Sequence, residues 1–534
     1  MPDQSNGAGT GDGPANPGHL PQVAQAFIRF GPGLALLAAA GAIFIVHLPV
    51  LSHYFFGDDF VPLADIASRS TPRYIADLFL LRDETPNWRF LTGLFYLAAY
   101  KTFGLNAFPF LLVSVLVHIG TAGLIFALLR KIMNAVWPAF LAAVFFGLTS
   151  AAVPTVGQVT AFNNVLGGFL LMLSIVLLYE GLDRERLRYW GAASVVSFAA
   201  AIAANESVAV LAPVPPLLAL WHVARKDGWW WRERATLRTL ALVSAPYAVI
   251  GGAALVALGA CGCTSAAGGG AYGVGSHMAG NLWLYLGRLL YPVGMEPPGE
   301  PNAAHLAAGL ALAGVLIAAL VRGPGLARFA AVFLLLALLP YLPLKLWSAP
   351  RYVYLASIPF SLLAAVVFSE AARYGRRLTP MIPGLLALVA FGVLGLYGWQ
   401  TWSQNQVIAG RSVQWQTMVA GLQARYPELP EGSIVYVHGG PFTDSLLQCH
   451  VLPALGEVLW GDVKLYTFYT TYLVGHRLRP GYDVHVAEYA GGRIVPIMIP
   501  EATPAEMNDS RVVLLPPVTS AAIDDGCLSV AGNA

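Results

Sequence analysis

The chain has 534 residues, of which 57% are hydrophobic and only 11% are charged, and its formal net charge is +2. With a mean hydropathy of +0.62, this composition excludes a soluble globular protein of ordinary make-up. The small net charge indicates no polyanionic partner, so we expect no nucleic acid binding. The composition predicts an α-helical polytopic membrane protein.

The first 30 residues are rich in Gly, Pro, Asn and Gln and contain no long apolar segment, which predicts a disordered cytoplasmic tail without a cleavable signal peptide. Repeated apolar runs then match the length of transmembrane helices. About eleven spans are expected, near residues 32–51, 107–129, 135–153, 162–180, 189–204, 207–223, 237–259, 303–321, 328–345, 352–370 and 380–399. The apolar segment 91–105 is too short to cross, and we expect it to lie at the interface or to re-enter.

Lys and Arg gather in alternate loops between these spans. Short loops dense in basic residues face the cytoplasm. The residues concerned are Arg130, Lys131, Arg184, Arg186, Arg188, Arg225, Lys226, Arg232, Arg234, Arg238, Arg322, Arg328, Arg373, Arg376 and Arg377. We therefore expect the other loops, and the chain beyond about residue 401, to lie on the outer face of a bacterial inner (plasma) membrane.

The chain changes character at its C-terminal end, where charged and polar residues return. Short β-like runs follow a helix-like run at 412–425, and they lie at 433–438, 463–467, 493–499 and 511–515. These runs predict a small extracytoplasmic α/β domain. The expected organisation is a tail at 1–30, a transmembrane domain at 31–401 and the outer domain at 402–534.

Two adjacent carboxylates, Asp58 and Asp59, follow the first predicted span. Ionisable groups held at the edge of a bilayer are costly and usually mark function. The alternative is an acidic N-cap that starts a short surface helix through Val61–Ser68. The local sequence is compatible with both interpretations.

The other outer loops carry further polar and aromatic candidates. They are Trp88, Arg89, Glu206, His277, Lys345, Arg351, Tyr352 and Tyr354. Acids near the start of the chain and bases near its end would meet at one membrane face. That pairing suits chemistry in which an acid activates a hydroxyl and cations receive a phosphate leaving group. As alternatives, Arg351 is an interfacial anchor, Glu206 caps a helix and His277 is an ordinary loop residue.

The ordered set of motifs resembles the GT-C superfamily of glycosyltransferases that use polyprenyl-phosphate sugars, in particular its protein O-mannosyltransferase-like branch. The likeness covers roughly residues 33–400. It rests on the di-acidic loop, the Trp88–Leu91 run, Glu206 between two spans, and the run Arg351–Leu355 that opens a late span. The pattern departs from the family at 161–164, where the family's Gly-Arg is here Ala-Phe-Asn-Asn, and at 205, where Asn replaces Lys.

The resemblance implies a GT-C-like fold and transfer of a sugar, with inversion, from a polyprenyl-phosphate donor to a hydroxyl of a lipid, glycan or protein acceptor. Asp58 or Asp59 would be the general base, and the other could orient it, bind the sugar or hold a divalent cation such as Mg²⁺ or Mn²⁺. Arg351, with Arg89 or Lys345, would bind the donor phosphate. The implied substrate contacts are Trp88, Glu206, Tyr352, Tyr354 and His277.

A membrane transporter or lipid flippase is the main alternative function. It would be expected to show repeated halves and polar residues near the middle of its spans. The sequence shows no internal repeat, and its polar candidates cluster on one face. An enzyme that works at the membrane surface is therefore favoured.

Overall fold

The apolar chain folds mainly as helices in the computed structural model. The residues that the structure describes are 22–80, 89–226, 234–260, 272–291, 302–345, 349–438, 440–441, 445–467, 484–496, 521–524 and 527–530. The longer helices of the membrane part are α1 (Gln22–His47), α5 (Phe108–Met133), α6 (Val136–Gly147), α8 (Phe162–Asp183), α9 (Leu187–Ala204), α10 (Val214–Lys226), α11 (Arg234–Ala260), α12 (His277–Leu290), α13 (Ala303–Arg322), α14 (Gly325–Leu338), α15 (Tyr354–Leu378) and α16 (Ile382–Arg425).

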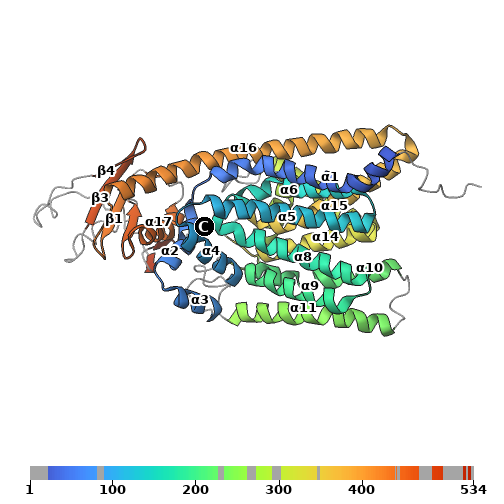
Figure 1. The fold of residues 1–534 in the computed structure, drawn as a ribbon, viewed down its shortest axis with the longest axis horizontal. Helices are drawn as coiled ribbons and strands as arrows, with labels where there is room; N and C mark the ends of the chain where they lie inside the picture. The colour runs from blue at the N-terminus through green and yellow to red at the C-terminus, as the bar shows by residue number, and fades with distance from the viewer. Residues whose placement is uncertain are drawn as a thin grey trace, which may run out of the picture.

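Short helices connect several of these elements. They are η2 (Leu48–Ser52), η3 (Gly57–Asp59), α2 (Phe60–Ala67), α3 (Thr71–Leu80), α4 (Phe90–Phe103), η4 (Ser150–Ala152), α7 (Val153–Val156), η5 (Val159–Ala161), η6 (Glu206–Leu211), η8 (Leu339–Tyr341) and η9 (Pro350–Val353). Helices α2, α3 and α4 lie together at one end of the bundle (Figure 1). The apolar segment 91–105, which was expected not to cross the membrane, corresponds to α4. This helix has 14 residues and is too short to cross a bilayer.

The prediction of a helical polytopic membrane protein is confirmed. Within the described residues, nine helices are long and apolar enough to span a membrane, and ten qualify if the bent pair Val136–Gly147 and Ser150–Val156 forms one span. The expected number of eleven is too high. The region near 328–345 contains an apolar helix over only Gly325–Tyr341. Pro340 and Pro343 lie at its end, where a proline ring prevents continuation of the helix.

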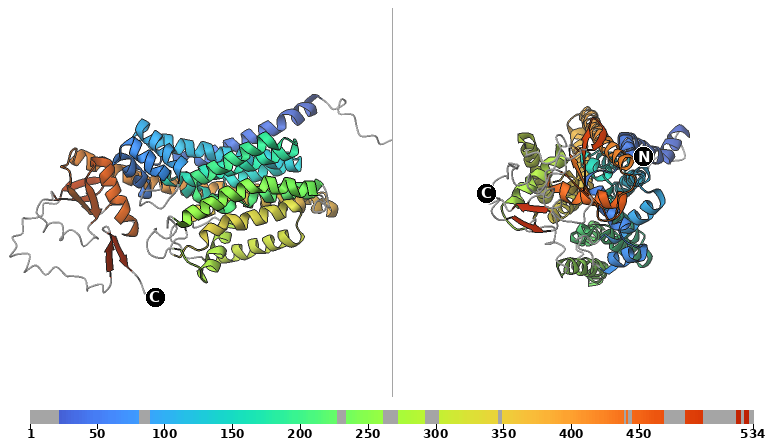
Figure 2. Two further views of the ribbon diagram at one scale, coloured as in Figure 1. Left: turned by 90° about the horizontal axis from the view of Figure 1, so that it is seen from below. Right: turned by 90° about the vertical axis from the view of Figure 1, so that its left-hand side faces the viewer.

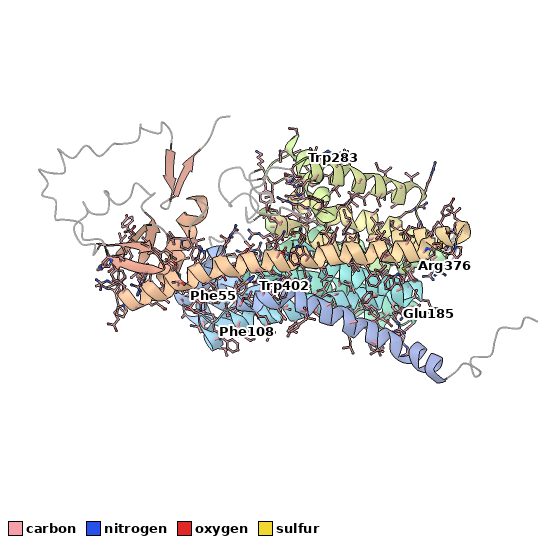
Figure 3. All side chains as sticks on the ribbon, turned by 90° about the horizontal axis from the view of Figure 1, so that it is seen from above. Phe55, Phe108, Glu185, Trp283, Arg376 and Trp402 are labelled. Atoms are coloured by element: carbon pink, nitrogen blue, oxygen red, sulfur yellow. The ribbon has the colours of Figure 1, made fainter. Side chains whose placement is uncertain are left out.

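The bundle has two distinct ends. Phe55 and Phe108 lie toward one end, and Glu185 and Arg376 lie at the other (Figure 3). Helix α5 begins at Phe108 and carries Arg130 and Lys131 in its last turn. The long helices α5 and α15 thus end in basic residues far from the acidic segment, which contains Asp58 and Asp59.

The helix α16 joins the membrane part to the C-terminal part. The predicted span at 380–399 and the predicted helical run at 412–425 belong to this one helix of 44 residues. At 1.5 Å per residue it is about 66 Å long, roughly twice the thickness of a bilayer core. Its second half therefore extends beyond the other spans, alongside which its first half packs (Figure 1).

The C-terminal part contains a mixed sheet, as predicted. Its strands are β1 (Ile434–His438), β2 (Lys464–Thr467), β3 (Val484–Ala490) and β4 (Arg493–Pro496), in the order β2-β1-β3-β4. Strand β1 pairs in parallel with β2 and β3, and β3 pairs antiparallel with β4. Helix α17 (Ser445–Trp460) supplies the crossover that parallel β1 and β2 require. A separate antiparallel pair consists of β5 (Ala521–Asp524) and β6 (Cys527–Val530).

Three of the predicted strands correspond to β1, β2 and β4, and the run at 511–515 lies outside the described residues. Residues 434–437 of β1 are hydrophobic and buried, as expected for a central parallel strand. The sequence analysis missed β3, in which polar residues such as His485 and Glu488 alternate with apolar ones.

The C-terminal sheet and the acidic segment lie at the same end of the molecule, as the views in Figures 1 and 2 show. Helix α17 packs against η3, which contains Asp58 and Asp59, and against α2, which begins directly after them. The rings of Phe60 and Trp415 are 5.7 Å apart and join α2 to the outer half of α16. Tertiary packing therefore places the acidic pair between the membrane bundle and the C-terminal part.

Candidate active site

The acidic segment begins with a backbone turn that requires glycine. Gly57 has a φ angle of 56°, in the left-handed region that residues with a Cβ rarely adopt. The chain then continues as η3 and α2. Asp59 precedes α2 directly, but its side chain makes no capping hydrogen bond to that helix. Capping of a surface helix therefore does not explain the acidic pair.

Asp59 is a buried carboxylate, with 1% of its surface exposed. Its Oδ1 accepts hydrogen bonds from the backbone N–H of Thr160 at 2.8 Å and from the Thr160 hydroxyl at 3.0 Å. Its Oδ2 accepts one from the backbone N–H of Phe56 at 3.2 Å. Burial raises the pKa of Asp59 to about 7, although these three hydrogen bonds favour the ionised form. Asp59 is thus held firmly and titrates near neutral pH.

Asp58 has a different environment from its neighbour. Its side chain is 33% exposed, and its Oδ2 lies 3.7 Å from Nη2 of Arg351. Arg351 belongs to η9, at the start of the span that contains α15. The structure therefore brings Asp58 next to the predicted phosphate-binding cation.

The turn Gly157–Thr160, which follows α7 and includes the start of η5, contacts both Asp59 and Arg351. Gln158 Oε1 accepts a hydrogen bond from Nη1 of Arg351 at 3.4 Å. Thr160, two residues later, donates the two hydrogen bonds to Asp59. The turn thus lies beside the carboxylates on one side and the guanidinium on the other.

Arg89 and Glu206 form a bidentate ion pair. Arg89 Nε lies 2.9 Å from Oε2 of Glu206, and Nη2 lies 2.8 Å from Oε1. This geometry satisfies the planar guanidinium and the carboxylate together. The charge of Arg89 is therefore neutralised within the protein, which leaves it less suited to bind a donor phosphate than Arg351.

Tyrosine rings connect this ion pair to Arg351. Tyr352 stacks on Tyr341 with ring centroids 4.9 Å apart, and the Arg351 guanidinium lies over the Tyr352 ring at 5.9 Å. The Tyr341 hydroxyl donates to Oδ1 of Asn164 at 3.5 Å, and the same oxygen accepts from Nδ2 of Asn205, next to Glu206 in the chain. Tyr352 is half-buried and lies between the cation and the ion pair.

The segments that contain His277 and Pro343 pack against each other beside the cluster formed by Arg351, Tyr352, Tyr341, Arg89 and Glu206. His277 Nε2 lies 3.3 Å from the carbonyl oxygen of Pro343, and Asn281 Nδ2 donates to the carbonyl of Leu344 at 2.6 Å. Lys345, which follows directly, is exposed, and its side chain lies against Gly273. Lys345 is accordingly held near the cluster but in a separate loop.

No protein-family model matches this chain. No curated protein matches it significantly in sequence.

Several solved structures have a similar arrangement. ArnT from Cupriavidus metallidurans bound to undecaprenyl phosphate is 14% identical, with a TM-score of 0.48 over 86% of this chain and 93% of that one. The oligosaccharyltransferase AglB from Archaeoglobus fulgidus, in complex with an inhibitory peptide and a dolichol-phosphate, is 11% identical, with a TM-score of 0.48 over 83% of this chain and 65% of that one. An oligosaccharyltransferase from Archaeoglobus fulgidus in complex with Zn and sulfate has a TM-score of 0.46 at 11% identity, over 82% of this chain and 62% of that one. These likenesses concern overall shape and do not identify a substrate.

Of the predicted substrate contacts, one lies outside the described residues and another lies away from the cluster. Trp88 lies outside the described residues, as do residues 82–84 of the same loop. Tyr354 is fully buried inside the bundle, where its hydroxyl lies 2.9 Å from Nδ1 of His118. A substrate at the acidic pair would not reach the Tyr354 side chain without displacing the packed core, so we do not include it in the site.

The sequence analysis also missed several residues that shape the site. Gln158 and Thr160 are neutral, and nothing in their local sequence distinguishes them from other loop residues. Tyr96 in α4 donates from its hydroxyl to the Val159 carbonyl at 2.7 Å, and burial raises the pKa of this hydroxyl. The one available signal is that Gln158 and Thr160 lie within the short loop 154–161, between the predicted spans 135–153 and 162–180.

The ligand set that a divalent cation requires does not form from the described residues. No three His, Cys, Asp or Glu side chains gather there in a group that could hold a metal. Asp58 faces the guanidinium of Arg351, and both oxygens of Asp59 accept hydrogen bonds. These carboxylates therefore do not fit the hard, oxygen-rich coordination of Mg²⁺ or Mn²⁺.

Proposed function

We propose that this protein is an integral membrane glycosyltransferase of the GT-C type, which moves a sugar from a polyprenyl-phosphate donor to an acceptor hydroxyl with inversion. The observation that carries the proposal is the approach of Asp58 to Arg351. A partly exposed carboxylate and a guanidinium lie 3.7 Å apart at one end of a membrane bundle. Such a pair supplies both a proton acceptor and an anion-binding cation.

In the proposed reaction, the Asp58 carboxylate takes the proton of the acceptor hydroxyl. The acceptor oxygen attacks the anomeric carbon, and the bond from that carbon to the phosphate oxygen breaks with its electron pair going to the phosphate. The transition state has the oxocarbenium character common to glycosyl transfer. Arg351 binds the phosphate as its negative charge increases, and its planar fork can contact two oxygens. The donor phosphate therefore replaces Asp58 as the principal partner of Arg351.

The neighbouring groups would support this pair. Asp59 lies beside Asp58 but is buried and fully hydrogen-bonded, so it would orient the segment rather than take the proton. Lys345 is the exposed cation that could assist Arg351. Tyr352 would contact the sugar, and the Arg89–Glu206 ion pair would support the wall beyond it. His277 would hold the loop that carries Lys345.

The proposal is tested by the fate of the donor. Purified protein in lipid nanodiscs should release polyprenyl phosphate from a polyprenyl-phosphate hexose or pentose when acceptor lipid, glycan and protein fractions of a bacterial envelope are added. Mass spectrometry of those fractions should show one added sugar. A transporter or flippase would move the donor without cleaving it, so intact donor after prolonged incubation with every fraction would contradict the enzymatic function.

The proposed location is a bacterial inner membrane, with the acidic pair and the C-terminal sheet on the outer side. The basic last turns of α5 and α15 support this orientation. Alkaline phosphatase fused after Tyr426, just past α16, is expected to be active, because that enzyme folds only outside the cytoplasm. Green fluorescent protein fused after Asn134, between α5 and α6, is expected to fluoresce. The reverse pattern would place the candidate site in the cytoplasm and contradict the orientation.

A further inference from the structure

The turn Gly157–Thr160 contacts Arg351, one member of the proposed catalytic pair, and Asp59, the neighbour of the other member, Asp58. We infer that this turn sets the distance between the base and the phosphate-binding cation, with Thr160 and Gln158 as its two positioning residues. The inference rests on the proposed function, because it assigns a role in the reaction to residues that are neither acidic nor basic. The sequence of the turn, Gly157-Gln158-Val159-Thr160, contains no group that could take a proton or bind a metal by itself.

The contact with the acidic segment is made by Thr160. Its backbone N–H and its hydroxyl both donate to the same oxygen of Asp59. Because Asp59 is buried, these charge-assisted hydrogen bonds are not exposed to competition from bulk water. Asp58 is the adjacent residue in a three-residue helical turn, so fixing Asp59 also limits where Asp58 can move.

The contact with the cation is made by Gln158. Its Oε1 accepts from Nη1 of Arg351, whereas Nη2 of the same guanidinium faces Asp58. A neutral amide oxygen can orient the guanidinium without neutralising it. Glu206 does the opposite to Arg89, whose charge it cancels through two hydrogen bonds. Gln158 thus leaves Arg351 with its positive charge available for a phosphate.

The turn is itself held from two sides, which it must be if it is to position other groups. The Gly157 carbonyl lies 3.1 Å from Nδ1 of His53, and the Val159 carbonyl accepts from the Tyr96 hydroxyl at 2.7 Å. His53 and Tyr96 are both buried. A Cβ at position 157 would lie 2.8 Å from the Val153 carbonyl oxygen and 3.0 Å from the His53 ring. Glycine is therefore required for this close approach.

The same support reaches the helix that carries the C-terminal sheet. Nε2 of His53 lies 3.0 Å from the carbonyl oxygen of Asn405, in α16. One buried imidazole thus contacts the turn and α16 at once. The position of the turn is consequently tied to the packing of α16 on the bundle, in addition to its local hydrogen bonds.

The test of Thr160 uses three variants of the full-length protein in nanodiscs. Thr160→Val removes the hydroxyl but keeps the shape, and we expect kcat to fall about tenfold, in line with a hydrogen bond to a charged group of roughly 1.5 kcal/mol. Thr160→Ser keeps the hydroxyl and should retain most of the activity. Thr155→Val is the matched control, because it removes a nearby buried hydroxyl that contacts only the Ala151 carbonyl.

Gln158→Leu should act on the other partner. We expect the KM for the donor to rise several-fold with little change in kcat, because the guanidinium loses its orienting acceptor.

The pH profile provides a further readout. Asp59 has a pKa of about 7 and is faced by Asp58 and Tyr96 as well as by Thr160. We expect kcat to rise as the pH increases through about 7, where Asp59 loses its proton. Loss of the Thr160 hydroxyl should move this transition to higher pH, since the ionised carboxylate loses a hydrogen-bond donor.

The outcomes separate two failures. If the wild-type protein cleaves no polyprenyl-phosphate sugar, both the proposed function and this inference fall. If the wild-type protein is active but Thr160→Val and Gln158→Leu match it in kcat, KM and pH profile, the inference alone is wrong. Equal losses in Thr160→Val and Thr155→Val, with unchanged pH profiles, would likewise reduce the role of Thr160 to general packing and overturn the inference.

Discussion

Asp58→Asn is expected to lower the rate of sugar transfer by about 10²–10⁴-fold, the range that a general base typically contributes. Asparagine has nearly the same shape as aspartate but cannot accept the acceptor's proton. The change also removes the negative charge that faces Arg351 at 3.7 Å, so donor binding should persist or tighten. The measurement is single-turnover transfer from a polyprenyl-phosphate sugar, with donor affinity determined in parallel.

Two further variants define what the Asp58 result means. Asp65→Asn, on the following helix α2, removes an acid that forms an ion pair with Arg69 at 3.8 Å, and it should transfer sugar at the wild-type rate. Asp59→Asn should be slower by about tenfold, because the amide group cannot accept the Phe56 hydrogen bond and carries no charge. A wild-type rate in Asp58→Asn would remove the proposed base.

The pH dependence follows from the buried member of the pair. Since the pKa of Asp59 is raised to about 7, this carboxyl is neutral below that pH and charged above it. Activity should rise as pH increases through about 7, where the ionised form accepts the Thr160 hydrogen bonds at full strength. Asp59→Asn should abolish this transition, because the amide does not titrate.

Arg351→Ala is expected to lower kcat/KM for the donor by about 10²–10³-fold, comparable to the loss of one donor to a developing anion. The phosphate gains negative charge as it leaves, and Arg351 is the cation next to the proposed base. Arg351→Lys should recover only part of the loss, since an ammonium cannot contact two oxygens at once. The measurement is donor binding and transfer in nanodiscs, alongside the thermal stability of each variant.

Arg89→Ala is the matched control for Arg351→Ala. Arg89 is bound to Glu206 by two hydrogen bonds, so its removal leaves a partly buried carboxylate without its partner. We expect a lower melting temperature as the main effect. If Arg351→Ala behaves as Arg89→Ala does, losing stability but keeping donor affinity, Arg351 is a structural residue rather than the phosphate ligand.

The sequence was sufficient to predict the helical membrane part and three of the six described C-terminal strands, β1, β2 and β4. Apolar runs of about 20 residues have few alternatives to spanning helices, since a bilayer leaves backbone groups no other partners. The count of spans was less secure, because prolines at 340 and 343 shorten α14. Strand β3 was missed because its pairing with β1 and β4 outweighs a locally polar sequence.

The candidate site was predictable where charge stands out against an apolar background. Asp58, Asp59 and Arg351 could be selected from the sequence because ionisable groups at a membrane edge are costly. The individual roles of these three residues could not be predicted from the sequence. Two adjacent aspartates look identical in sequence, and only burial separates Asp59, at 1% exposed, from the accessible Asp58.

Tertiary structure alone decided which charges are available and which residues position them. Arg89 and Glu206 cancel each other because packing brings two distant loops within hydrogen-bond distance. Gln158 and Thr160 acquire their roles from contacts with Arg351 and Asp59, and an amide or a hydroxyl has no local pattern that announces such contacts. By itself, the sequence determined where the chain meets the membrane and which rare charges lie at its edge. The pairing of those charges depends on distances between remote segments, which are set only when the helices pack.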